Sequence, residues 1–317
     1  MSKQRVGLSM IELVVALSII GILVSLLLVA VQQARESSRN LSCSNNLRQI
    51  ALASQAHLAT HGHFPAVGWG RNWIALRDRG YGLKQPGGWM YNLLPLLEAN
   101  STHALAATED ESVVGLDIAR VENFNRLIHS SFVCPAKMAP NNDRRYTGAS
   151  WQGDVLGGYP SSFAINAGSN TIGGELSGPT TLDFSDFRAL WPATAKPANG
   201  LATPGQLLDA KHVSDGMSNT IFAGEKYVVR NRRNYVGDTL SPWFGFSLSS
   251  TRFVALSPFR DGDPHGDPQS FGSPHPSHFN VAMCDGAIRP LSFEITQKVF
   301  TDLGVRDDGN PISAGDY

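Results

Sequence analysis

The feature that most constrains this chain is an apolar run near its beginning. From Leu13 to Val31 no residue is charged, and Ser18 and Ser25 are the only polar side chains. As a helix with a rise of about 1.5 Å per residue, this run spans roughly 30 Å, the thickness of the hydrocarbon core of a bilayer. A buried helix of a soluble domain is usually amphipathic, so the run predicts a membrane-spanning helix.

A single carboxylate, Glu12, lies at the entrance of this run, behind a short basic leader that ends at Gly7. A carboxylate in a low-dielectric environment is costly unless a cation or a proton neutralises it. If a peptidase cut after Gly7, the new amino group of Leu8 would lie four residues from Glu12. The amine of a neighbouring, axially staggered copy could then neutralise Glu12 and fix the register between packed helices.

The segment from Gly7 to Leu28 resembles the N-terminal signature of type IV prepilins and pseudopilins. That signature is a basic leader, a glycine, a hydrophobic first mature residue, a glutamate at mature position five and a long apolar helix. Leu8 and Met10 differ from the residues that are commonest in the family. The resemblance implies that a prepilin peptidase cleaves after Gly7 and methylates the new amine, and that a pilus or type II secretion-like machine exports the chain.

Two simpler interpretations of the N-terminus stay open. A secretory signal peptide would have an apolar region of about 7–15 residues before a small-x-small cleavage site, and this run is longer. A plain single-pass anchor would need Glu12 only to reach the headgroups. The basic residues do not decide the orientation, because they flank the run on both sides.

The chain stays compatible with a helix beyond Val31 but becomes amphipathic. Leu47, Ile50, Ala53, His57 and Leu58 recur at three- and four-residue steps. Gly62 and Pro65 are stop signals, so we predict one helix from about residue 8 to residue 61, with Asn45-Asn46 as a possible interruption. The predicted division of the chain is a leader (1–7), a transmembrane and stalk helix (8–62) and a head (63–317).

The head shows short segments typical of strands. Residues 159–169 and 218–226 are apolar stretches bounded by glycine and serine. Near the C-terminus two alternating arms flank Asp285-Gly286, a pair typical of a two-residue type I′ turn, and Pro290 predicts that the return arm lies at a sheet edge. We therefore predict an α+β fold that is pilin-like, with a long N-terminal helix and an extracytoplasmic head containing an antiparallel β-sheet.

Several segments together resemble a narrower group of prepilin-like proteins, the family of domain of unknown function 1559 (DUF1559). The resembling segments are Cys43–Pro65, Gly88–Glu98, Val133–Pro135, Val213–Lys226 and the His-x9-Asp-Gly pattern formed by His275, Asp285 and Gly286. The resemblance implies the architecture and the export route, and it implies no established chemistry.

Three cysteines are too few for a disulfide scaffold and have no C-x-x-C spacing for zinc or thiol exchange. In an oxidising compartment Cys43 and Cys134 could tie the stalk helix to the head, but two separate buried thiols fit the sequence equally well. Cys284, beside the predicted turn, is expected to be a packing residue.

The loop "RDGDPHGDP" is the best candidate for a cation site. Asp261, Asp263 and His265 occupy alternate positions, as at the start of an oxygen-rich calcium loop. Gly272, however, stands where a bidentate glutamate is needed, so calcium is a possible cofactor and a solvated loop is the alternative.

His275 and Asp285 could suggest a metal site or a proton relay. The hairpin alone already explains Asp285, and a histidine before a proline commonly closes a loop. We therefore expect structural roles for both residues.

Composition excludes some functions. With Lys+Arg 26 against Asp+Glu 27, the chain has no basic field that would bind nucleic acid. The sequence contains no nucleophile elbow, phosphate loop or paired carboxylates in a recognisable frame, so no enzymatic activity is expected.

These observations predict a prepilin-like subunit of the cytoplasmic (inner) membrane, single-pass, with its head outside the cytoplasm. Its expected partners are a prepilin peptidase, the membrane, and copies of itself or other pilin-like subunits in a pilus, pseudopilus or type II secretion-like fibre. The alternative is a membrane-anchored extracytoplasmic protein that binds a solute or a surface and does not polymerise. A secreted hydrolase is the weakest interpretation.

Overall fold

A computed structural model gives the fold. It describes residues 10–108, 124, 127–137, 150–151, 154–155, 161–170, 178–179, 198–229, 240–310, 312 and 315. The leader, including Gly7 and Leu8, therefore lies outside the described residues.

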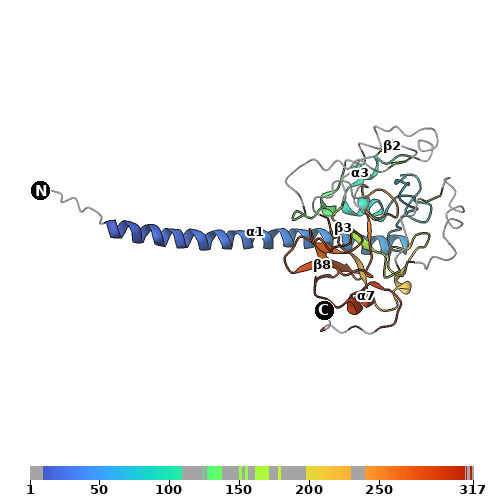
Figure 1. Cartoon of the computed structure of the whole chain (residues 1–317). Helices are drawn as coiled ribbons and strands as arrows, with labels where there is room; N and C mark the ends of the chain where they lie inside the picture. Colours follow the sequence, from blue (N-terminus) through green and yellow to red (C-terminus); the bar gives the residue numbers. More distant parts are fainter. Residues whose placement is uncertain are drawn as a thin grey trace.

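Helix α1 (Met10–His61) is a single helix of 52 residues that projects from the head (Figure 1). Asn45-Asn46 does not interrupt it, and it ends where Gly62 takes a positive φ of 77° and its N–H donates to the carbonyl of Leu58 at 2.9 Å. A glycine in this conformation is a common helix stop, because it has no Cβ to clash. The predicted extent of the helix is confirmed over the described residues.

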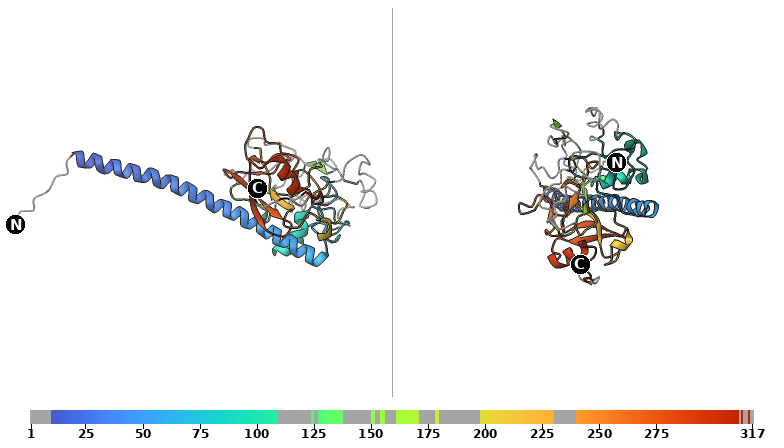
Figure 2. Two further views of the ribbon diagram at one scale, coloured as in Figure 1. Left: turned by 90° about the horizontal axis from the view of Figure 1, so that it is seen from below. Right: turned by 90° about the vertical axis from the view of Figure 1, so that its right-hand side faces the viewer.

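The two halves of α1 have different surroundings. Every residue of the first half, 10–35, is exposed, and α1 is the one helix in the described part of the chain that is long and apolar enough to cross a membrane. The second half, 36–61, runs along the head in both views of Figure 2 and contributes to its core. The stalk is therefore also a structural element of the head.

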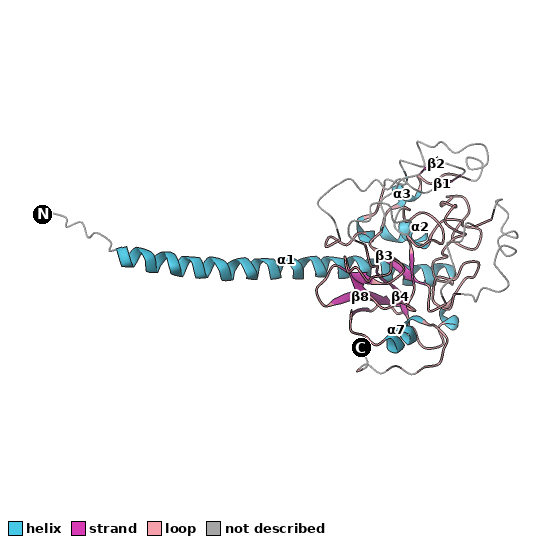
Figure 3. Cartoon of the chain, viewed as in Figure 1, coloured by secondary structure: helices cyan, strands magenta, loops and turns pink. Residues whose placement is uncertain are grey.

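A five-stranded sheet forms the centre of the head (Figure 3). Its order is β5-β3-β4-β8-β9, with strands β3 (Phe163–Asn166), β4 (Ile221–Glu225), β5 (Thr251–Arg252), β8 (His278–Met283) and β9 (Ile288–Ser292). The pairs β3–β4, β4–β8 and β8–β9 are antiparallel, as predicted. Strand β5 instead adds parallel to β3, so the sheet is mixed and not purely antiparallel.

Short elements surround this sheet. They are α2 (Trp89–Leu93), η1 (Leu94–Leu97), α3 (Asn100–His103), η2 (Ser130–Phe132), η3 (Ala210–His212), α7 (Gln297–Gly304) and the short pairs β1 (Ser150–Trp151) with β2 (Asp154–Val155) and β6 (Phe259–Arg260) with β7 (Gly272–Ser273).

The sheet lies between two helices, because successive side chains of a strand point to opposite faces. On β8, Phe279, Val281 and Met283 pack in one apolar cluster with Phe300 and Leu303 of α7. The alternate residue Ala282 belongs to a second cluster, which includes the buried side chains of α1. Figure 1 shows β8 between α1 and α7.

The β8–β9 hairpin is confirmed, with β9 and its Pro290 at the sheet edge, but its predicted turn is wrong. Only Gly286 has a positive φ, of 92°, whereas a type I′ turn needs one at Asp285 as well. The N–H of Gly286 donates to the carbonyl of Met283 at 3.0 Å, and the N–H of Met283 donates to that of Ala287 at 2.8 Å. The loop is thus a three-residue turn that closes with a glycine bulge.

Candidate functional site

One stripe of α1 faces the head. Its members recur at alternating four- and three-residue steps, the spacing that keeps side chains on one face of a helix. They are Glu36, Asn40, Cys43, Leu47, Ile50, Ser54 and His57; the last five are buried and the first two are half-buried. The polar end of this stripe, where α1 enters the head, is the candidate site, here called the junction site.

A buried histidine links α1 to the sheet at the junction site. Nδ1 of His275 lies 2.8 Å from a carboxylate oxygen of Glu36 on α1. Its Nε2 lies 3.5 Å from Oε1 of Glu225, the last residue of β4, and both of these side chains are fully buried. His275 therefore lies between two carboxylates that come from different elements.

The second oxygen of Glu225 is held by hydrogen bonds. Both the backbone N–H and the side-chain amide of Asn280 donate to Oε2, at 2.8 Å and 3.2 Å. The side-chain amide of Asn280 also donates to Asn40 of α1 at 2.9 Å. This network fixes the orientation of Glu225 and makes a second polar link between α1 and β8.

The charges at the junction site decide the protonation of His275. Burial alone would lower the pKa of His275, but the nearby side chains of Glu225 and Glu36 outweigh it, and the pKa is raised above its ordinary value. The two acidic side chains on either side of His275 therefore favour its protonated form. One partner of the ion pair cannot be removed without leaving a buried charge uncompensated.

A disulfide lies beside these residues. Cys43 of α1 and Cys134, which follows η2, are bonded, with their Cα atoms 4.7 Å apart and a sequence separation of 91. The sequence left a bond and two separate thiols equally open. A bond that closes a loop of this length stabilises a fold by about 4–5 kcal/mol in the loop-entropy description. Such bonds persist in oxidising compartments.

The disulfide and the ion pair form one cluster. The two sulfur atoms, a ring nitrogen of His275 and a carboxylate oxygen of Glu225 all lie within 4.8 Å of one another, and all four residues are buried. Among the described residues no other group of histidine, cysteine, aspartate or glutamate side chains gathers in this way. The four ligand-type atoms come from four segments that are distant in sequence.

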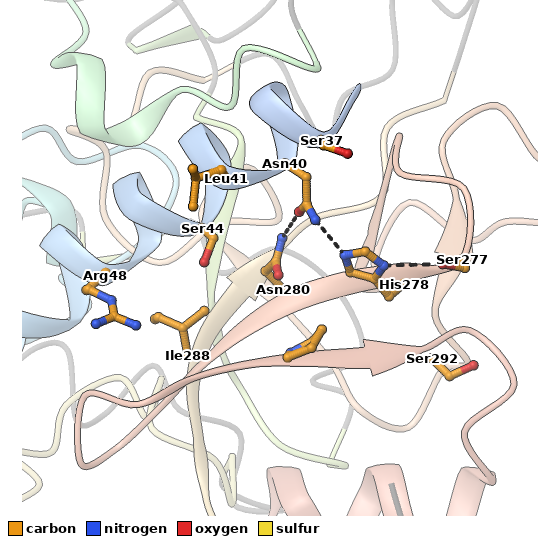
Figure 4. Close-up of a pocket in the computed structure, with 11 residues that line it drawn as sticks. Ser37, Asn40, Leu41, Ser44, Arg48, Ser277, His278, Asn280, Ile288 and Ser292 are labelled. Atoms are coloured by element: carbon orange, nitrogen blue, oxygen red, sulfur yellow. Dashed lines mark hydrogen bonds between the residues drawn. The ribbon is translucent and has the colours of Figure 1, made fainter. Parts of the chain in front are cut away.

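A groove opens next to the cluster, between α1 and the β8–β9 hairpin (Figure 4). Its volume is about 680 Å³, and Asn40, Arg48, His278, Asn280 and Pro290 are among the residues that line it. The Asn40 amide donates to Nε2 of His278 at 3.0 Å, so Asn40 bridges to two residues of β8. Asn280, which donates to Glu225, is thus also part of the groove wall.

The His-x9-Asp-Gly pattern is not a single chemical site. His275 precedes β8 and Asp285 follows it, so the strand separates them. Asp285 is exposed, and its carboxylate accepts from the N–H of Ala287 at 2.9 Å within the turn. Asp285 and Gly286 thus belong to the hairpin turn, whereas His275, for which a structural role was also expected, lies in the junction site.

The three residues proposed for calcium do not converge. Asp261 is turned inward, where it lies 3.4 Å from the ammonium of Lys137 and accepts from the N–H of Val228 at 3.0 Å. Asp263 instead accepts from the N–H of His265 at 2.9 Å and closes its own turn. Burial raises the pKa of Asp261, and the positive charge of Lys137 opposes that rise. In the structure, the side chains of Asp261 and Asp263 thus have different partners, and calcium binding by this loop stays a prediction.

Glu12, the residue expected to carry the assembly register, lies in the first turn of α1 and is exposed. A carboxylate in the first turn of a helix is favoured by the positive end of the helix dipole. Its predicted partner, the amine of Leu8 on another copy, lies outside the described residues.

Sequence reasoning missed two residues of the junction site, Glu36 and Glu225. Glu36 lies seven residues before Cys43 and so on the same helical face, a signal that the sequence contained. Glu225 ends an apolar strand of five residues, where a buried carboxylate needs a specific partner. That partner, His275, could not be identified without the fold.

The fold and the junction site define the class of the protein: an α+β head built onto the second half of a long helix whose first half is apolar. The profile of a family described as "Protein of unknown function (DUF1559)" matches residues 32–298, and the chain belongs to this family. Comparisons with curated proteins and with solved structures find no match. The matched range contains the whole junction site and begins just after the apolar run.

Proposed function

We propose that the chain is a pilin-like structural subunit that is inserted in the cytoplasmic membrane, cleaved after Gly7 by a prepilin peptidase and assembled through its N-terminal helix into a fibre. The observation that carries the proposal is the exposed first half of α1. Its large apolar side chains from Leu13 to Val29 are each between 53% and 64% exposed. So continuous an apolar surface must be shielded from water, by lipid before the subunit joins a fibre and by neighbouring helices afterwards.

Glu12 gives the assembly its register in this proposal. A carboxylate at the entrance of an apolar helix is stable beside an amine that arrives from another copy, since each charge neutralises the other. Because the described residues of the head pack on the second half of α1 and residues 10–35 are exposed, the first half stays available to bundle with copies of itself or with other pilin-like subunits. The fibre would be a pilus, a pseudopilus or a type II secretion-like fibre, at the cell surface or in the periplasm.

The processing step has a direct test. The intact mass of the chain purified from its native membrane should correspond to loss of residues 1–7 and addition of one methyl group. A Gly7→Val variant, which changes only the residue before the cut, should keep the leader. Retention of residues 1–7 in the unaltered chain would overturn the proposed processing.

The assembly step is tested separately. Fibres sheared from cells and quantified with an antibody to the head should fall at least roughly tenfold for Glu12→Ala, because the uncompensated amine then opposes packing. Glu294→Ala removes an exposed carboxylate of the head and is the matched control. Equal fibre yields for the two variants would contradict the role of Glu12.

A second candidate is a membrane-anchored binding protein that does not polymerise. The groove between α1 and the β8–β9 hairpin favours it, because a concave surface of about 680 Å³ is large enough for a small solute. In this case Glu12→Ala would leave both the membrane location and ligand binding unchanged, and no fibre would form from the unaltered chain.

A further inference from the structure

We propose that Cys43, Cys134, Glu225 and His275 bind a single zinc ion when the disulfide between the two cysteines is reduced. The proposal concerns the buried cluster of the junction site and does not depend on whether the chain polymerises. Under this proposal the cluster is cross-linked by the disulfide when Cys43 and Cys134 are oxidised and by a zinc ion when they are reduced.

The ligand set and its dimensions fit zinc. Two thiolates, an imidazole and a carboxylate are ligand types that zinc binds in tetrahedral sites, with bond lengths of about 2.0–2.3 Å and therefore ligand-to-ligand distances of roughly 3.3–3.8 Å. Nε2 of His275 and Oε1 of Glu225 are already 3.5 Å apart. The other ligand pairs lie within 4.8 Å of one another, and rotation of the cysteine side chains, once the disulfide is broken, would separate the two sulfurs and adjust these pairs to the spacing that zinc needs.

Two buried atoms point to a missing cation. Nε2 of His275 and Oε1 of Glu225 face each other, yet neither has a hydrogen bond of good geometry in the described part of the chain. Buried polar atoms are nearly always satisfied, so an exception requires an explanation. A zinc ion bound to both atoms in the reduced chain would satisfy them.

The surrounding hydrogen bonds are those that a metal site needs. A histidine that ligates through one nitrogen commonly donates its other N–H to a carboxylate, which fixes the tautomer and the ring orientation. Glu36 accepts from Nδ1 of His275 at 2.8 Å and so directs Nε2 into the cluster. Asn280 holds the far oxygen of Glu225 at 2.8 Å in the same manner. Glu36 and Asn280 are therefore positioning residues and not ligands.

The chemistry balances as follows. A dithiol or phosphine reductant gives two electrons to the disulfide, and two protons complete the two thiols. Zinc then displaces both thiol protons and the proton on Nε2 of His275, because thiolate and neutral imidazole are the binding forms. The oxidised chain has no thiolates at this position and cannot form the site.

The test uses the full chain in detergent micelles, reduced with a phosphine under nitrogen and freed of metal with a chelator. Titration with zinc sulfate should give one zinc per reduced chain and none per oxidised chain. Cobalt(II) should produce the visible absorption of a tetrahedral thiolate complex in the reduced chain only. The absence of stoichiometric zinc in the reduced chain, or equal binding by the oxidised chain, would overturn the proposal.

Variants assign the ligands. Cys43→Ser and His275→Gln should each weaken zinc binding by roughly 100-fold or more, and Glu36→Gln by roughly 10- to 100-fold, as is typical for loss of a positioning partner. Cys284→Ser is the matched control, since Cys284 is also buried but lies outside the cluster. Loss of binding in Cys284→Ser, with Cys43→Ser unaffected, would contradict the assignment.

A second measurement avoids variants that fail to fold. In the unaltered reduced chain, zinc should protect Cys43 and Cys134 from alkylation by iodoacetamide, which mass spectrometry resolves for each cysteine. Chelator should remove the protection of these two residues without changing the modification of Cys284. Equal alkylation of Cys43 with and without zinc would also overturn the proposal.

Discussion

The first half of α1, residues 10–35, and its second half, residues 36–61, belong to one uninterrupted helix, yet only the second half buries side chains. Residues 13–31 of the first half are apolar on all sides, whereas the second half packs on the head along a single stripe. Neither half contains a proline, so the helix continues through both of them. The distribution of polar residues around the helix decides what each half packs against.

The polar side chains of the two halves also find different partners. In the first half, the hydroxyls of Ser18 and Ser25 donate to carbonyls of the same helix, at 2.8 Å each. Such internal bonds are required where no water is available. In the second half, Glu36, Asn40 and Asn46 reach across to the head. The second half therefore provides polar cross-links to the head, although Ser42 and Thr60 also donate to carbonyls of the helix itself.

The largest difference between the halves is expected for a core truncation. Ile50→Ala should lower the free energy of unfolding of the head by about 2–5 kcal/mol, because it leaves a cavity in a packed core. Ile22→Ala makes the same change in the first half and should alter head stability by less than about 0.5 kcal/mol. Urea unfolding of the oxidised chain in detergent measures both, since all six tryptophans lie beyond residue 63. Equal losses would show that the first half also supports the head.

The same contrast explains what could be predicted from the sequence. Patterns within one segment were sufficient for α1 and for the β8–β9 hairpin, because periodicity and stop signals are local. The turn was wrong because Asp-Gly fits both a type I′ turn and the last two positions of a three-residue turn. Strand β5 was missed because it has two residues, Thr251–Arg252, in a serine-rich stretch without alternation.

The junction site escaped prediction for a different reason. His275 and Glu36 are 239 residues apart, and Glu225 comes from a third segment. The sequence has no C-x-x-C spacing, so a rule based on local spacing excludes zinc. Four segments that the fold brings together nevertheless place two sulfurs, a nitrogen and an oxygen within 4.8 Å. The charge and ligand pattern of such a site exists only in three dimensions.

A smaller effect on the free energy of unfolding is expected from the pH dependence of His57, near the C-terminal end of α1. Burial and the nearby His61 and His63 lower the pKa of His57 to about 4, although its hydrogen bond to the carbonyl of His63 opposes the shift. His57 is therefore neutral in the fold but gains a proton on unfolding below about pH 6.5. Its stabilising contribution is complete above that pH and is lost as the pH falls toward 4, at a cost of about 2 kcal/mol by pH 5.

The measurement compares unfolding free energies at pH 7 and pH 5 for the unaltered chain and for His57→Gln. The acid-induced loss should be smaller in the variant by about 2 kcal/mol. His61→Gln is the control, because His61 is exposed on the same turn and should change the acid-induced loss much less. An identical pH dependence in the unaltered chain and His57→Gln would contradict the buried neutral state of His57.

A glycine-to-alanine substitution in the hairpin turn and one in the first half of α1 should differ by about 1 kcal/mol in their effect on the stability of the head. Gly286 has a φ of 92° in the hairpin turn, a conformation that alanine adopts only at a cost. Gly286→Ala should therefore destabilise the head by about 1 kcal/mol. The added Cβ itself would fit, because its nearest neighbour, Cγ of Gln55, is 3.6 Å away. Gly21→Ala, in the first half of α1, meets nothing within 4 Å and should leave head unfolding unchanged. Thermal unfolding followed by near-UV circular dichroism compares the two. A neutral Gly286→Ala would mean that the turn adopts a different backbone conformation.

The smallest effect is expected for the hydrogen bonds that Asn46 makes between α1 and the head. The amide of Asn46 donates to the carbonyls of Val133 and Ser130 at 2.7 Å and 3.3 Å, next to the disulfide. Asn46→Ala should cost about 0.5–1.5 kcal/mol, because a half-exposed hydrogen bond is worth little more. Ser25→Ala removes a hydroxyl that bonds only within the first half and should cost the head nothing measurable. If Asn46→Ala were as neutral as Ser25→Ala in the oxidised chain, the disulfide alone would hold this part of α1 to the head. Reduction should then expose the difference between the two variants, since the hydrogen bond becomes the remaining link to that segment.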